Sequence, residues 1–224
     1  MITRDGTTRR SVLAVDKRYR EPLRIGLDDC MAQLRLAEFL ASWKRLAPDI
    51  PVELVEMHTP ELLAALRKEE VDVAFSFEPV DDEVIVQQTA WISPMVAILP
   101  SEHELAGRNM LSLAELLSFP FIACTAAFRP GLYLQVASLL QQQGLSPVIA
   151  AEARTLSGYL TCVALGQGVG VAGADQMRTL QRSDVVVLPL TEPAHFTTYV
   201  LHKHQRFGLS EPVQRFLTHV STLT

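Results

Sequence analysis

The length and composition of the chain are those of a globular protein with an acidic balance of charge. It has 224 residues, 48% of them hydrophobic and 20% charged, and 20 Lys and Arg against 25 Asp and Glu give a net charge of −5. This composition excludes a disordered, fibrous or membrane-spanning chain. The acidic balance argues against a nucleic-acid surface on this piece, since phosphate contacts require a dense array of Lys and Arg.

The three cysteines indicate a reducing compartment. Cys30, Cys124 and Cys162 are an odd number and lie far apart, so they form no readable disulfide framework or metal pair. Residues 1–22 contain no apolar run long enough for a signal sequence or a spanning helix. We therefore expect a cytoplasmic protein without membrane contact, in which residues 1–22 are an N-terminal remnant or linker.

From residue 23 onward, strand-like runs alternate with helical periods. Strands are predicted at 23–27, 52–56 and 71–75, and helices at 31–46 and 61–68. The hydroxyl of Thr59 is expected to cap the second helix, and Pro60 suits its first turn. The β-α-β-α-β order predicts right-handed crossovers and a parallel, doubly wound sheet.

The pattern then starts a second time. Two strands, 84–89 and 95–99, lead into predicted helices at 112–117, 132–142 and 157–165 and strands at 119–124, 148–152, 168–172 and 185–190. A last strand at 197–201 and a helix at 212–222 are too little for a third core. The predicted fold is α/β, with two Rossmann-like lobes whose doubly wound mixed sheets are joined by two crossover segments.

The expected lobes are interleaved along the chain. Lobe I comprises 23–99 and 197–224 and lobe II comprises 100–196, with crossings near 99–101 and 194–197. Two crossings imply a cleft with a hinge at its base. Ligands of open α/β sheets bind beyond the carboxyl ends of the strands, where helix N-termini present free amides, so the cleft suits a small ligand with an acidic or polar end.

A series of short motifs, in order and at characteristic intervals, resembles a known family. They are LRIG at 23–26, VELVEMHT at 52–59, VDVAF at 71–75, AILPSEHELA at 97–106, LAELLSFPFI at 113–122 and VALGQGVGVAG at 163–173. Together they resemble the effector-binding domain of LysR-type transcriptional regulators, which is itself similar to type 2 periplasmic binding proteins. The resemblance runs from about 23 to 223. The family's N-terminal winged helix-turn-helix is expected to be missing from this piece.

The resemblance and the strand-end rule together nominate an effector pocket. Cys30 and Thr59 would line it from lobe I, and Thr125, Phe128 and Pro130 from lobe II. A guanidinium beside helix N-termini can clamp a carboxylate bidentately, so the expected effector is a small organic acid, aromatic acids included. The predicted effector-binding residues are Cys30, Met31, Thr59, Phe77, Thr125, Phe128, Arg129, Pro130 and Arg154.

The family implies a sensor whose ligand acts by favouring one arrangement of the lobes. It also implies a homodimer, which can become a tetramer in the full-length protein, with helix 31–46 against the partner's 132–142; DNA would be contacted only through the missing N-terminal domain. Two alternatives stay open: a stand-alone solute receptor, which would require export, and an enzyme using Cys30 or Cys124, for which no base is identifiable.

Other motifs carry no function of their own. The string GQGVGVAG contains GxGxxG at 168–173, but a helix precedes it where a dinucleotide site requires a strand, so its glycines are expected to permit close packing. His202 and His204 lack further ligands and are interpreted as a solvated strand end. We expect no catalytic residue, no metal and no cofactor.

Overall fold

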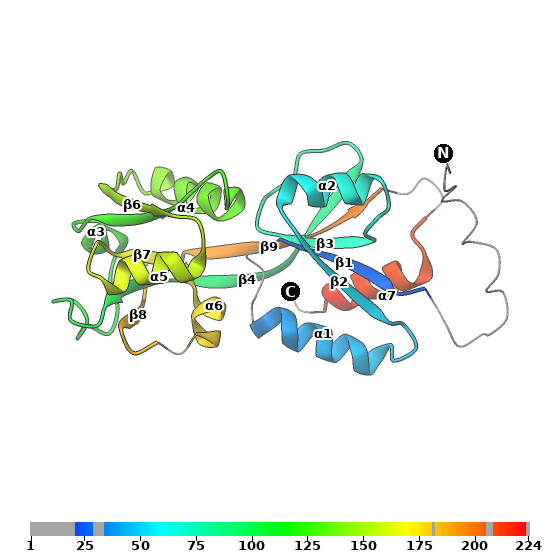
Figure 1. The fold of residues 1–224 in the computed structure, drawn as a ribbon, viewed down its shortest axis with the longest axis horizontal. Helices are drawn as coiled ribbons and strands as arrows, with labels where there is room; N and C mark the ends of the chain where they lie inside the picture. The colour runs from blue at the N-terminus through cyan, green and yellow to red at the C-terminus, as the bar shows by residue number, and fades with distance from the viewer. Residues whose placement is uncertain (1–20, 29–33, 181, 205–207, 223–224) are drawn as a thin grey trace, which may run out of the picture.

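A computed structural model of the chain describes residues 21–28, 34–180, 182–204 and 208–222. Helices and strands alternate along most of its length (Figure 1). In chain order the elements are β1 (Leu23–Asp28), α1 (Leu34–Leu46), β2 (Val52–Met57), α2 (Thr59–Arg67), β3 (Val73–Ser76), β4 (Ile85–Pro100), α3 (Leu113–Leu116), β5 (Phe121–Cys124), α4 (Pro130–Gln142), β6 (Ile149–Ala153), α5 (Leu156–Ala164), β7 (Gly170–Gly173), α6 (Ala174–Thr179), β8 (Val185–Pro189), β9 (His195–Lys203) and α7 (Glu211–Val220).

One mixed sheet runs through the whole molecule. Its strand order is β2-β1-β3-β9-β4-β7, β8 also pairs with β4, and β5 and β6 form a small second sheet. β1 is parallel to β2 and β3, whereas β9 is antiparallel to β3 and β4. The predicted α/β class with mixed sheets is confirmed.

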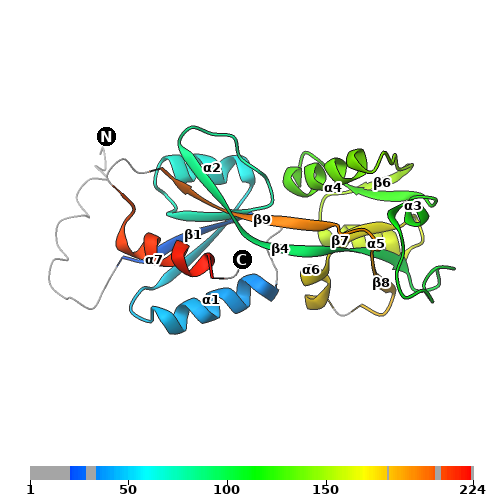
Figure 2. The same cartoon turned by 180° about the vertical axis from the view of Figure 1, so that it is seen from behind.

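Two long strands connect two halves of the molecule. The first half contains β1, β2, β3, α1, α2 and α7, and the second contains β5 to β8 with α3 to α6; β4 and β9 pass from one to the other (Figures 1 and 2). β4 pairs with β9 from Ile85 to Pro94 and with β7 and β8 from Met95 onward. The change of partner therefore lies near Pro94.

The prediction of two separate strands at 84–89 and 95–99 is wrong, because both belong to the 16-residue strand β4. Pro94 and the polar residues before it resemble a break in the sequence. In the structure, proline is tolerated because it lies where one partner strand replaces another, and a register shift between Thr89 and Trp91 lets the strand bend.

One predicted helix cap needs correction, and one helix was missed. Thr59 does not cap α2: the N-cap is His58, without a side-chain hydrogen bond, and Thr59 is already helical. Its hydroxyl instead donates to Oδ2 of Asp28 at 3.0 Å, which ties the start of α2 to the end of β1. α6 was not predicted, because six residues are too few to show a helical period.

An aromatic cluster fixes α1 and α7 on the sheet of the first half. Phe39, Trp43, Phe75, Trp91 and Phe216 are all buried, and their ring centroids lie 5.2–6.5 Å apart in mostly edge-on and tilted arrangements. Such pairs add stabilisation beyond the apolar area that they bury. The cluster makes the first half a rigid platform for the strand ends.

His202 is a further correction. It was interpreted as part of a solvated strand end, but it is buried, because at this position β9 has β3 on one side and β4 on the other. The neighbouring His204 is exposed. A strand between two partners has no solvated edge.

The second half contains a gap in its sheet that a tyrosine fills. β5 and β7 share one bridge, Phe121 with Val169, and then separate. The Tyr159 hydroxyl accepts from the Val171 nitrogen at 2.7 Å and donates to the Val171 oxygen at 3.0 Å, so it satisfies backbone groups that β5 leaves unpaired. A Cβ on Gly170 would overlap this hydroxyl, which confirms that the glycines permit close packing.

Candidate effector-binding site

Most of the predicted pocket residues lie at strand ends and helix starts where the two halves meet. Thr59 and Phe77 belong to the first half, and Thr125, Phe128, Arg129, Pro130 and Arg154 to the second. Cys30 and Met31 lie outside the residues that the structure describes.

On the first half, the two predicted residues contribute different groups. The Thr59 hydroxyl is engaged by Asp28, as described above, and Thr59 is buried. The Phe77 ring is 2% exposed and packs edge-on against Phe196, with 6.1 Å between centroids. Its ring therefore belongs to the core, whereas its carbonyl lies at the boundary and accepts a hydrogen bond from Gln135 of α4.

On the second half, the loop between β5 and α4 is built by short hydrogen bonds. The Thr125 nitrogen and hydroxyl both donate to the Ala153 oxygen, at 3.1 and 3.2 Å, which joins the ends of β5 and β6. The Phe128 and Arg129 nitrogens donate to the Thr125 oxygen at 3.1 and 2.9 Å. The loop thereby holds the first turn of α4 in a fixed place.

The two predicted arginines are held in different ways. The Arg154 guanidinium is exposed and lies over the Phe128 ring, with its central carbon 4.7 Å from the ring centroid. This is a cation–π contact at a solvent-accessible site. Arg154 is therefore positioned by an aromatic face, and it carries its charge in water.

Arg129 is the unusual residue of the site. It is only 7% exposed, it occupies the N-cap position of α4, and its Nε atom is buried without a hydrogen-bond partner. Across the described ranges, its guanidinium takes part in none of the ion pairs. A buried cation without a counter-charge is costly, and the positive end of a helix adds to the local potential. This arrangement favours an anion.

Arg129 also affects the cysteine next to it. Burial raises the pKa of the Cys124 thiol, and the nearby Arg129 charge opposes that rise. Burial likewise raises the pKa of Tyr159 well above its usual value. Both groups stay protonated at neutral pH, so Arg129 is the charged group of this cluster.

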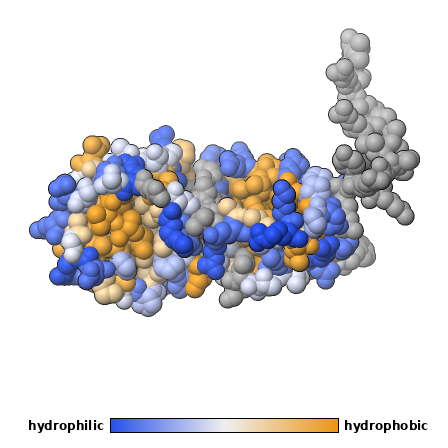
Figure 3. Space-filling model, turned by 90° about the horizontal axis from the view of Figure 1, so that it is seen from below, coloured by the Kyte–Doolittle hydropathy of each residue, from blue (hydrophilic) through white to orange (hydrophobic). Residues whose placement is uncertain are grey.

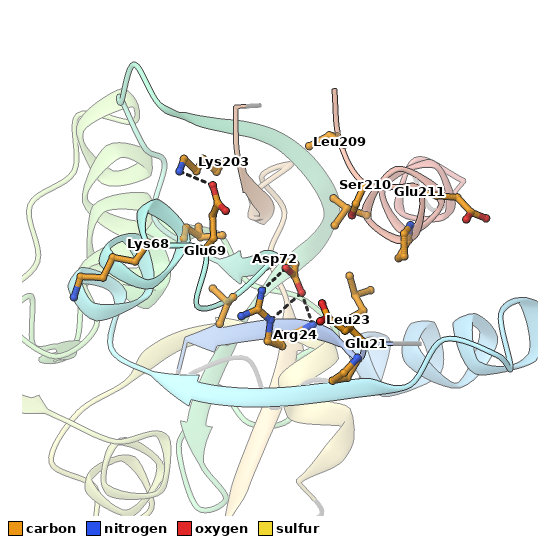
Figure 4. Close-up of a pocket in the computed structure, with 15 residues that line it drawn as sticks. Glu21, Leu23, Arg24, Lys68, Glu69, Asp72, Lys203, Leu209, Ser210 and Glu211 are labelled. Atoms are coloured by element: carbon orange, nitrogen blue, oxygen red, sulfur yellow. Dashed lines mark hydrogen bonds and ion pairs between the residues drawn. The ribbon is translucent and has the colours of Figure 1, made fainter. Parts of the chain in front are cut away.

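One cavity adjoins the site, and a second lies far from it. One of about 480 Å³ lies beneath α4 against β5 and β6, and Cys124, Tyr133 and Tyr159 are among its lining residues. The other, of about 870 Å³, lies at the opposite end of the first half, between α2 and the start of α7 (Figure 4). It is lined by the beginnings of β1 and β3, away from the carboxyl ends at which ligands of such sheets bind.

Two ion pairs engage both partly buried cations of the larger pocket. Arg24 pairs with Asp72 at 2.7 Å and Lys203 with Glu69 at 2.7 Å, and Figure 4 shows both pairs inside the pocket. A ligand there would have to compete with existing partners. The pocket therefore offers no unmatched charge comparable to Arg129.

Among the residues that the structure describes, no group of three or more His, Cys, Asp and Glu could hold a metal ion. In the same part of the chain, no helix is both long and apolar enough to span a membrane.

Sequence reasoning missed three residues that shape the site: Gly131, Gln135 and Tyr159. Gln135 and Tyr159 act through backbone groups remote in sequence, which no local pattern reports. Gly131 did leave a signal, because a glycine in the first turn of a helix weakens the helix and is retained where another backbone approaches closely.

The chain belongs to the family of LysR substrate-binding domains, whose family model matches residues 16–223. Among curated proteins it is 31% identical over 170 residues to the transcriptional regulator CatR of Pseudomonas putida, and 27% identical over 205 residues to the regulator CysB of Haemophilus influenzae. These matches cover 76% and 88% of this chain. The chain spans 58% of the length of CatR and 62% of that of CysB.

Solved structures share the fold. The effector-binding domain of BenM with its effector benzoate matches with a TM-score of 0.79 and 19% identity, covering 90% of both chains. The effector-binding domain of QuiR in complex with shikimate matches with a TM-score of 0.75 and 17% identity, covering 90% of this chain and 96% of the other. The fold is thus that of LysR effector-binding domains.

Proposed function

We propose that this domain senses a small organic acid, and that binding controls a LysR-type DNA-binding transcriptional regulator. The observation that carries the proposal is Arg129, a buried cation at the start of α4 that forms no ion pair with any residue the structure describes. The effectors bound by the structural neighbours BenM and QuiR, benzoate and shikimate, are both carboxylates. A carboxylate on Arg129 would supply the missing charge and gain charge-assisted hydrogen bonds.

In the proposed mode of action, the acid lies between the two halves. Arg129 holds the carboxylate, Thr125, Phe128 and Pro130 surround it, and Arg154 covers the outer side from its place on Phe128. From the first half, we expect contacts from Thr59 and the backbone at Phe77; Cys30 and Met31, also predicted to bind the effector, lie outside the described residues. The ligand changes the equilibrium only through its preference for one arrangement of the halves.

The two halves are expected to move relative to one another when a ligand binds. We propose that 23–99 with 197–224 and 100–196 respond as two lobes, and that 1–22 lead to a DNA-binding domain in the parent protein. DNA would be contacted only there.

The parent protein is expected to be a cytoplasmic regulator, and the domain is expected to catalyse no reaction.

We also propose a homodimer, and a tetramer in the full-length regulator. Exposed apolar side chains on each half support it: Leu46, Val52 and Leu54 lie on α1 and β2, and Tyr133, Leu134, Val148 and Ile149 lie on or beside α4 and β6. Figure 3, seen from below Figure 1, shows apolar surface on the side of the molecule where α1 lies, whereas α4 and β6 lie on the side hidden in this view. An antiparallel pair of subunits would place α1 of one against α4 of the other and cover both.

A thermal-shift screen tests the proposed ligand class. Benzoate, shikimate and other small carboxylates are compared with their uncharged amides, because a ligand that binds only the native state raises stability by RT ln(1 + [L]/Kd). We expect at least one acid to raise the unfolding temperature and its amide to have no effect. Equal effects of acid and amide, or no stabilising acid in the series, would contradict the proposal.

A further inference from the structure

One side chain of the second half is hydrogen-bonded to the backbone of two other segments. One of these segments belongs to the first half, and the other is a connecting strand. Gln135, on α4, donates through Nε2 to the Phe77 oxygen at 2.6 Å and to the Thr197 oxygen at 2.8 Å. Its Oε1 accepts from the Thr197 nitrogen at 2.7 Å. Phe77 follows β3, and Thr197 lies in β9, one of the two connecting strands.

The position of these bonds in the sheet is informative. β3 pairs with β9 in antiparallel register up to Ser76 opposite Tyr199. If the ladder continued, residue 78 would face Thr197. The chain leaves the sheet there, and the Gln135 amide occupies the place of that peptide group, donating to and accepting from Thr197 as a strand residue would.

A close backbone contact fixes α4 at the same place. A Cβ on Gly131 would lie 2.5 Å from the Phe77 carbonyl carbon and would overlap the Glu78 nitrogen. Only glycine therefore lets the first turn of α4 rest directly on the end of β3. Gly131 and Gln135 are one helical turn apart, so two successive turns of α4 contact the first half.

We propose that Gln135 is the positioning residue that sets the angle between the two halves. Its amide pairs with the backbone of β9 beyond the end of β3, near the point where β4 changes partner. The three hydrogen bonds therefore hold the connecting strands and α4 in one arrangement. Arg129 is at the start of the same helix. A displacement of α4 by an anion bound to Arg129 would therefore be transmitted to β9 through Gln135. This last step rests on the proposed function, whereas the positioning role does not.

The test uses the ligand-free domain, so that its failure is distinct from failure of the proposed function. Gln135→Leu keeps an apolar side chain at this position, one atom shorter than glutamine, and removes all three hydrogen bonds. The matched control is Gln142→Leu on the same helix, where the side chain is exposed and donates to the Ser138 hydroxyl. Hydrogen exchange of the Thr197 amide, read by NMR, reports directly on the acceptor that Gln135 supplies.

We expect the Thr197 amide to exchange at least about tenfold faster in Gln135→Leu and to be unchanged in Gln142→Leu. Residual dipolar couplings of the two halves should fit one alignment in the wild type and the control but require two in Gln135→Leu. Gln135→Asn, whose amide is one methylene too short, should behave like Gln135→Leu and serves if that variant does not fold. Unchanged exchange at Thr197, or one common alignment of the two halves in Gln135→Leu, would overturn the proposal.

Discussion

At the scale of single residues, two side chains make hydrogen bonds to strand backbone on an edge where the described part of the chain places no neighbouring strand. Tyr159 satisfies both backbone groups of Val171 in the gap between β5 and β7, and Gln135 does the same for Thr197 beyond the end of β3. Each supplies the hydrogen bonds that a neighbouring strand would otherwise make at that position. Neither role can be predicted from sequence, because both partners lie where tertiary packing puts them.

Removal of the Tyr159 hydroxyl should destabilise the fold. Tyr159→Phe leaves the Val171 nitrogen and oxygen buried without partners, and we expect a loss of about 1–3 kcal/mol in the free energy of unfolding. Urea denaturation measures it. The control is Tyr133→Phe, on an exposed ring, where we expect a change below about 0.5 kcal/mol. Equal stabilities of the two variants would show that the hydroxyl is not needed.

Arg129 should also control the reactivity of Cys124. Its charge opposes the rise in thiol pKa caused by burial, so Arg129→Met, which keeps much of the volume, should raise the pKa further. At pH 8 less thiolate is then present, and alkylation of Cys124 should slow. Mass spectrometry can follow Cys124 against Cys162 in the same molecule. A Cys124 rate that stays constant relative to Cys162 would refute the coupling.

At the scale of elements, α7 is attached to α1 through a histidine whose burial favours the neutral form. His219 stacks on Phe39 with 4.9 Å between centroids, and its Nε2 lies 2.7 Å from the Ser42 hydroxyl. Burial lowers its pKa. The folded state therefore binds a proton less readily than the unfolded state does.

This pKa shift predicts a loss of stability in acid. The contribution of neutral His219 is complete above the unfolded pKa of about 6.5 and declines as the pH falls through that value toward the lower folded pKa. The urea midpoint of the wild type should fall between pH 7 and 5, and His219→Gln should remove part of that dependence. His204→Gln, at an exposed position, should not. An identical pH profile for the wild type and His219→Gln would contradict this account.

Most elements were predictable, because apolar periodicity reports local structure. The alternation of 23–27, 31–46 and 52–56 recurs as β1, α1 and β2, and the motifs pointed to the family. What failed were features decided by tertiary context. Pro94 resembles a strand end but marks a change of partner within β4, and Thr59 resembles a cap but bonds to Asp28. The position of the candidate residues at strand ends and helix starts was predictable, whereas the burial of Arg129 was not.

At the scale of the whole molecule, the exposed apolar faces predict association. Leu134→Glu places a charge on α4 within the proposed dimer face, where burial of an unpaired carboxylate is costly. We expect light scattering to give twice the chain mass for the wild type and the monomer mass for Leu134→Glu. Leu165→Glu, exposed at the end of α5, serves as control and should stay dimeric. A monomeric wild type, or a dimeric Leu134→Glu, would rule out this interface.

The central claim is that Arg129 recognises an anion, and a calorimetric titration tests it most directly. The acid that stabilises the domain most is titrated into the wild type, into Arg129→Met and into Arg178→Met, whose arginine is exposed on α6. Since loss of one partner of a buried charge pair costs about 2–5 kcal/mol, we predict at least about a 30-fold weaker affinity for Arg129→Met and an unchanged affinity for Arg178→Met. An affinity of Arg129→Met within about threefold of the wild type, less than 1 kcal/mol, would contradict the account.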